Sequence, residues 1–191
     1  MTFGYRLNVE QLMYKRASYN YEKALSKMVD VPDSIPETGK LYYFEGPGLE
    51  DDETIALCIE CIIEWAASLE SFVNLVWLGN KISSQEEERN YSSTIAKIKR
   101  LYQIEDLLYG DSKWKSGVEK LFAMRNYLMH YKEAITYTGF SFATKFQHEF
   151  SKNNMIKIKR DIYLAIKEIG GYFNIDCGFV DGDYDHLVYK Y

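Results

Sequence analysis

The distribution of proline constrains the fold of this chain of 191 residues more than any other feature. All three prolines, Pro32, Pro36 and Pro47, fall within residues 31–48, where several glycines accompany them. Proline disrupts the interior of a helix because it lacks an N–H and its ring clashes with the preceding turn. The long proline-free remainder therefore favours helices, and residues 31–48 mark the clearest break in the chain.

Apolar residues recur at helical spacing in five segments, which predicts helices over residues 9–29, 52–78, 91–108, 113–133 and 154–173. Residues 134–152 fit either an extended loop or a helix from Lys145 to Phe150. Turn residues alternate with aromatic residues near the C-terminus, which permits a short hairpin there.

This pattern predicts an all-α, up-and-down bundle of four to five helices. We expect residues 1–50 to be an N-terminal helical appendage with a proline-containing linker, residues 51–175 to be the main helical domain, and residues 176–191 to be a C-terminal tail.

Composition excludes several classes of protein. The formal net charge of −5 argues against a generic basic nucleic-acid binder, although a local basic patch remains compatible with it. The first residues lack the apolar core of a signal peptide, and no apolar stretch is long and uncharged enough to span a bilayer. Three cysteines cannot all pair with one another, so we expect reduced thiols in a cytoplasmic protein.

The predicted helix at 113–133 carries a charge in an unexpected place. At about 100° per residue, its apolar side chains span a sector of roughly 120°. Arg125 falls near the middle of this sector, and Asn126 and His130 share one edge of it. An arginine there is costly unless a carboxylate, a phosphate or an interface meets it. The apolar residues of the sector are Trp114, Val118, Leu121, Phe122, Leu128 and Met129.

The predicted helix at 52–78 shows the same anomaly with the opposite charge. Glu70 lies inside its apolar stripe and Asn74 lies at the border one turn later. We therefore expect Glu70 and Arg125 to meet in the bundle. One interpretation is a buried ion pair that fixes helix register. The other is an anion-handling site of Arg125, Asn126 and His130, suited to phosphodiester cleavage because arginine matches phosphate and histidine exchanges protons near neutral pH.

The string LFAMRNYLMHYKE, residues 121–133, resembles the signature of the HEPN superfamily. These small α-helical bundles carry an arginine, usually a polar residue after it, and a histidine after four to six intervening residues. Arg125, Asn126 and His130 match with four intervening residues. The string ASLESFVNLV, with Glu70 and Asn74, is similar to the first core helix of such domains. The resemblance covers about residues 52–173.

The resemblance implies a metal-independent endoribonuclease in which the RNA 2′-hydroxyl attacks the adjacent phosphate. His130 would act as general base or acid, Arg125 would stabilise the phosphorane, and Asn126 would orient the substrate or His130. Members typically form homodimers whose motifs face a common cleft. Many belong to toxin–antitoxin, phage-defence or RNA-processing systems, which implies a cognate antitoxin or regulatory protein. Others are non-catalytic modules, so the alternative is a helical domain that binds a protein partner or a nucleotide.

Further residues receive weaker interpretations. Tyr127, Tyr131 and Lys132 follow the motif arginine and are candidates for contacts to RNA, with packing on the helix surface as the alternative for both tyrosines. Cys58 and Cys61 form a lone CxxC on a predicted helix, which favours their packing as small hydrophobic residues. Neither they nor the aspartates near the C-terminus supply a full ligand set, so we predict no metal and no cofactor.

Overall fold

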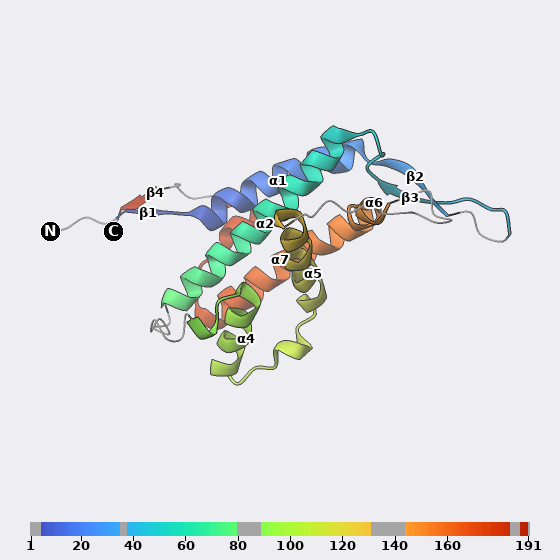
Figure 1. Ribbon diagram of the computed structural model, residues 1–191. Helices are drawn as coiled ribbons and strands as arrows, with labels where there is room; N and C mark the ends of the chain where they lie inside the picture. The colour runs from blue at the N-terminus through green and yellow to red at the C-terminus, as the bar shows by residue number, and fades with distance from the viewer. Residues whose placement is uncertain (1–4, 35–37, 80–88, 131–143, 184–187, 191) are drawn as a thin grey trace.

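A computed structural model describes residues 5–34, 38–79, 89–130, 144–183 and 188–190 of the chain (Figure 1). The described residues include six α-helices and little strand, which confirms the predicted all-α bundle. The helices are α1 (Val9–Lys27), α2 (Asp52–Gly79), α4 (Thr94–Ile104), α5 (Lys115–Met129), α6 (Lys145–Glu149) and α7 (Lys152–Phe173). Two short 3-10 helices are η1 (Tyr109–Asp111) and η2 (Gly178–Asp181), and the strands are β1 (Tyr5–Leu7), β2 (Val29–Ser34), β3 (Tyr42–Gly46) and β4 (Val188–Lys190).

Local side-chain chemistry sets several of the helix ends. The Asp51 carboxylate accepts the Thr54 N–H at 3.0 Å and so caps α2. A capping box between Thr144 and Gln147 starts α6, which resolves the ambiguity over residues 145–150 in favour of a helix. The predicted helix at 91–108 is shorter than expected, because α4 ends at Ile104 and Asp106 adopts a left-handed conformation with φ of 53°.

Helix α2 is the centre of the bundle, because it contacts α1, α4, α5 and α7. In Figure 1, α1 and α2 lie side by side, with α5 and α7 packed beneath them. The three tryptophans of the chain, Trp65, Trp77 and Trp114, are fully buried in one continuous core. Helix α1, which was expected to belong to an appendage, adds its own buried face to that core. The buried apolar residues of α1 are Tyr14, Ala17, Tyr21 and Ala24.

Two small sheets lie outside the predictions made from the sequence. The proline-containing segment, expected as a linker, forms an antiparallel pair in which Val31 of β2 lies opposite Phe44 of β3. At the other end of the molecule, β4 pairs with β1, so the described strand of the tail is joined to the N-terminus and not to a second strand of the tail. No helix among the described residues combines the length and apolar character needed to cross a membrane.

Candidate active site

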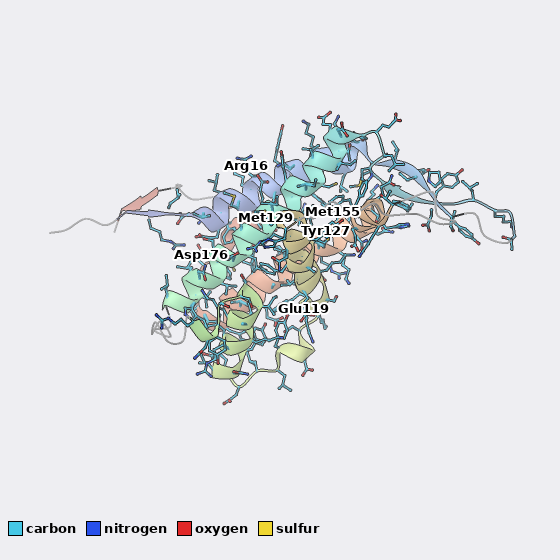
Figure 2. The ribbon with its side chains drawn as sticks, in the orientation of Figure 1. Arg16, Glu119, Tyr127, Met129, Met155 and Asp176 are labelled. Atoms are coloured by element: carbon cyan, nitrogen blue, oxygen red, sulfur yellow. The ribbon has the colours of Figure 1, made fainter. Side chains whose placement is uncertain are left out.

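The motif recognised in the sequence occupies the last turns of α5, and the two halves of this helix differ in burial. Val118 and Leu121 in the first half are fully buried, whereas Tyr127 and Met129 near its end are 55% and 59% exposed. Figure 2 labels Tyr127 and Met129 at this end of the helix. His130 caps the C-terminal end of the helix, and its backbone N–H donates to the backbone carbonyl of Asn126 at 3.0 Å. The motif therefore lies where α5 extends beyond the tightly packed core.

The expected contact between Glu70 and Arg125 is confirmed. Arg125 Nη2 donates to Glu70 Oε2 at 2.7 Å, which joins α5 to α2. The side chains of Arg125 and Glu70 are 31% and 41% exposed, so the ion pair is not buried as one interpretation assumed. Met129, expected in the core sector, is also largely exposed. An exposed ion pair stabilises a fold by only about 0–1 kcal/mol, which weakens the interpretation that this pair is kept to fix helix register.

The guanidinium of Arg125 is held by three neighbours. Besides the bond to Glu70, Nη1 donates to Asn126 Oδ1 at 3.0 Å, and Cζ lies 6.0 Å from the centre of the Phe122 ring. These side-chain hydrogen bonds engage two of the five N–H donors that arginine carries. Arg125 is thus oriented by its neighbours and partly open to solvent, which is the arrangement expected of a group that receives a phosphate oxygen.

His130 is exposed and projects from a different side of α5. It follows Arg125 by five residues, which corresponds to roughly 140° around a helix. Asn126 lies between the two in this rotation and is also exposed. By this rotation, the positions of Arg125 and His130 lie on different sides of the α5 axis, and it is Arg125 that contacts α2.

The structure treats the other residues predicted for the site in three different ways. Asn74, expected to support the motif, has its amide oxygen bonded to Lys97 Nζ of α4 at 2.7 Å, so the structure ties it to a different helix. Tyr127 lines a pocket on the side of α5 that faces α6. Tyr131 and Lys132 lie outside the described residues.

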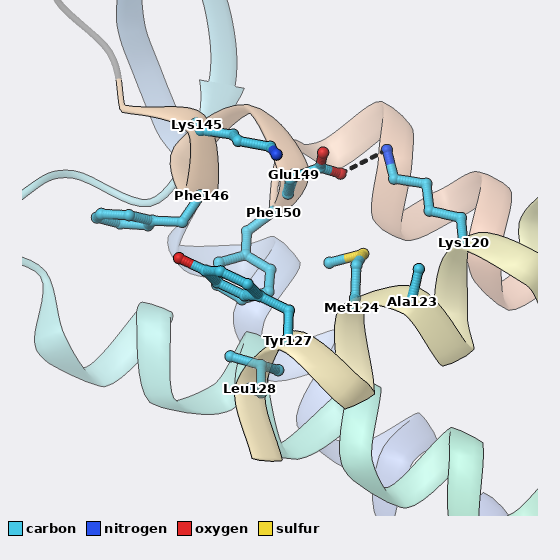
Figure 3. A pocket seen from close by; sticks show the side chains of 9 residues that line it. All are labelled: Lys120, Ala123, Met124, Tyr127, Leu128, Lys145, Phe146, Glu149 and Phe150. Atoms are coloured by element: carbon cyan, nitrogen blue, oxygen red, sulfur yellow. Dashed lines mark ion pairs between the residues drawn. The ribbon is translucent and has the colours of Figure 1, made fainter. Parts of the chain in front are cut away.

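This pocket was not predicted from the sequence. It has a volume of about 200 Å³ and lies between α5 and α6 (Figure 3). Lys145, Phe146 and Phe150 line it from the α6 side, in the segment that the sequence left open between loop and helix. A usable signal was present, because Phe146 and Phe150 are four residues apart after the N-cap Thr144.

The other cysteine and aspartate candidates have structural roles. Cys58 and Cys61 are fully buried, and burial raises the pKa of the Cys58 thiol to about 12 and that of Cys61 further still, so neither is a reactive thiolate. Asp181 accepts hydrogen bonds from Lys167 and Tyr163, which lower its pKa. The described residues contain no group of three or more His, Cys, Asp or Glu side chains placed to hold a metal ion.

Comparisons of the chain with models of protein families, with curated proteins and with solved structures give no match.

Proposed function

We propose that this protein is a metal-independent endoribonuclease of HEPN type that acts as a homodimer. The observation that carries the proposal is the 2.7 Å pair between Arg125 and Glu70, with an exposed His130 at the end of the same helix. The pair was expected from the placement of both charges inside the apolar stripes of their helices, and both residues also lie in the strings that resemble HEPN domains. A toxin or a component of phage defence, controlled by an antitoxin or regulatory protein, is the biological role that this class implies.

The proposed reaction uses the RNA itself as nucleophile. The 2′-oxygen forms a bond to the adjacent phosphorus, the bond from phosphorus to the 5′-oxygen breaks, and a 2′,3′-cyclic phosphate and a 5′-hydroxyl result. His130 takes the proton from the 2′-hydroxyl or gives one to the leaving 5′-oxygen. Arg125 stabilises the charge that develops on the phosphorane oxygens, and Asn126 orients the substrate or His130.

Dimerisation is supported by the divergence of Arg125 and His130 around α5, because two copies allow the arginine of one to face the histidine of the other. Met129, one turn after Arg125, exposes 59% of its surface at this end of the helix, as expected of an apolar residue that a second copy covers.

The test is cleavage of a DNA oligonucleotide that contains a single ribonucleotide, in excess EDTA. We expect the wild-type protein to cut only after the ribonucleotide, and His130→Ala to lose about 10²- to 10⁴-fold in rate. His148→Ala is the matched control, because His148 lies on α6, where it contacts Asp33 at 3.0 Å and stacks on Phe44. It is expected to retain activity.

Two results would contradict the proposal. Equal cleavage by wild type and His130→Ala would mean that another group, or a contaminant, does the chemistry. Absence of any cleavage over a panel of RNAs would leave the alternative, a helical module that binds a protein partner or a nucleotide without catalysis.

A further inference from the structure

The pocket between α5 and α6 has a floor and walls of apolar side chains. Met124 and Phe150, 8% and 3% exposed, form its buried part, and the rings of Tyr127 and Phe146 approach it from the two helices (Figure 3). Its volume of about 200 Å³ is below the ~300–1,000 Å³ of pockets that take drug-sized ligands. A single planar ring system suits this space better than a whole nucleotide.

The charges around the pocket favour a ligand that carries an anion. Lys120 Nζ lies 2.7 Å from a carboxylate oxygen of Glu149, so these two charges compensate each other. Lys145 is exposed at the start of α6, and its side chain extends along the pocket in Figure 3. The lining residues thus carry one net positive charge next to aromatic rings, which is the combination that proteins use to hold a stacked base and its phosphate.

The pocket adjoins the candidate active site through α5 itself. Tyr127 and His130 are three residues apart, and such positions are neighbours on a helix surface, about 5–6 Å apart at Cβ. A base stacked against Tyr127 would therefore place the next part of the RNA backbone near the position of His130. Apolar side chains of a protein partner would fill the same space, but they would not use Lys145 or the proximity to His130.

From these observations we propose that the pocket holds one nucleobase of a single-stranded RNA, stacked on Tyr127 and Phe146, with the attached phosphate at Lys145. The inference rests on the proposed function for its substrate and makes a separate claim about where a base is bound. It assigns Tyr127 and Lys145 a role in binding and none in proton transfer.

The test measures binding in the full-length His130→Ala background, so that RNA is not consumed. Fluorescence anisotropy follows two labelled oligonucleotides of equal length, one ordinary single-stranded RNA and one whose nucleotides are abasic. Tyr127→Ala is expected to weaken binding of the ordinary RNA about 5- to 150-fold, as measured for loss of a stacking partner, and to change binding of the abasic strand less than twofold. Lys145→Ala is expected to weaken both.

The controls separate loss of the ring from loss of the fold. Tyr127→Phe keeps the ring and is expected to bind as the parent does. Tyr19→Ala removes a tyrosine that is 71% exposed on α1 and is expected to have no effect. Because Tyr127 is itself 55% exposed, Tyr127→Ala is expected to keep the helical circular dichroism of the parent.

The outcomes distinguish this inference from the proposed nuclease activity. Cleavage by the wild type together with unchanged RNA binding by Tyr127→Ala overturns the base pocket and leaves the nuclease. Base-dependent loss of binding in a protein that never cleaves RNA supports the pocket and overturns the nuclease. Equal loss for the ordinary and abasic strands, or no RNA binding at all, overturns the pocket.

Discussion

The two halves of α5 have similar apolar spacing and opposite environments. In the first half, Gly117, Val118 and Leu121 are buried against the bundle, and α7 packs closely on this part. In the second half, the same spacing leads to Met129, which is exposed, and to Arg125, which forms a partly exposed ion pair with Glu70 of α2. Met129 is thus an apolar side chain left at the surface, although Leu128 beside it still packs against the core.

The charged side chains next to the two halves of α5 also differ in burial. Next to Gly117, Asp161 of α7 is fully buried, and its Oδ1 accepts two hydrogen bonds from Arg160 at 2.9 and 2.7 Å. Its Oδ2 has no hydrogen-bond partner within the described part of the chain. This carboxylate is enclosed by the protein, whereas the Arg125–Glu70 pair is accessible to an incoming phosphate. The charge next to the first half of α5 is enclosed by the fold, and the charged pair of the second half is partly exposed.

The largest expected effect comes from truncating an apolar side chain in each half. Leu121→Ala creates a cavity at a fully buried position and is expected to lower the free energy of unfolding by about 2–5 kcal/mol. Met129→Ala removes a side chain that is 59% exposed. It is expected to change the free energy of unfolding by less than about 0.5 kcal/mol. Urea denaturation at low protein concentration measures both, with the slope of the transition as a check on two-state behaviour.

Protein concentration sharpens this comparison. If a second copy covers Met129, the Met129→Ala variant loses stability only at concentrations where the wild type is dimeric. A loss from Met129→Ala that equals the loss from Leu121→Ala at every concentration would mean that the end of α5 is packed within one chain, and the contrast between the halves would be wrong.

A second, smaller effect is expected where α5 meets α7. A Cβ at Gly117 would lie 2.6 Å from Cβ of Asp161, closer than packed atoms allow, so the helices have to separate. Overpacking of this kind costs about 1–3 kcal/mol, and the better helix propensity of alanine offsets at most about 1 kcal/mol of it. We therefore expect Gly117→Ala to destabilise the protein by roughly 1–2 kcal/mol in the same denaturation assay.

Gly171→Ala is the matched control for this substitution. Gly171 is exposed in α7, and a Cβ there would meet nothing within 4 Å. It is expected to stabilise the protein by about 0.5–1 kcal/mol through propensity alone. Stabilisation by Gly117→Ala as well would show that α5 and α7 are not in close contact at Asp161.

The sequence predicted the main helices and one contact of the candidate site, for identifiable reasons. Long apolar periodicity defines α2 and α7, and two charges misplaced in such periodicity predicted the Glu70–Arg125 pair. The exposure of Met129 was not predictable, because periodicity shows which side of a helix is apolar and not how far its neighbours extend. Asn74 was assigned to the motif because its helix position is near Glu70, whereas the position of Lys97 on α4 decides its partner.

The pairing of strands across the chain was also beyond the sequence. Residues of β1 and β4 are separated by nearly the whole chain, and three-residue strands carry too little alternation to show a partner. The pocket beside Tyr127 was missed for a related reason, since it is formed by two helices whose relative position depends on tertiary packing.

The smallest expected effect on stability is the one that separates the two interpretations of the Arg125–Glu70 pair. A double-mutant cycle of Glu70→Ala and Arg125→Ala is expected to give a coupling energy of about 0.2–1 kcal/mol, because both side chains are partly exposed and water screens their attraction. The coupling should fall further in 1 M salt. Denaturation of the two single variants, the double variant and the wild type measures it.

The rate of RNA cleavage is expected to change far more than stability in the Arg125→Ala variant. Arg125→Ala should lose about 10²–10³-fold in the rate of RNA cleavage, since it removes a group that stabilises the transition state, while its stability changes by less than about 1 kcal/mol. The pair would then be kept for chemistry. A coupling energy above about 2 kcal/mol, together with activity that falls only in proportion to the folded fraction, would restore the interpretation that the pair fixes helix register and would remove Arg125 from the proposed mechanism.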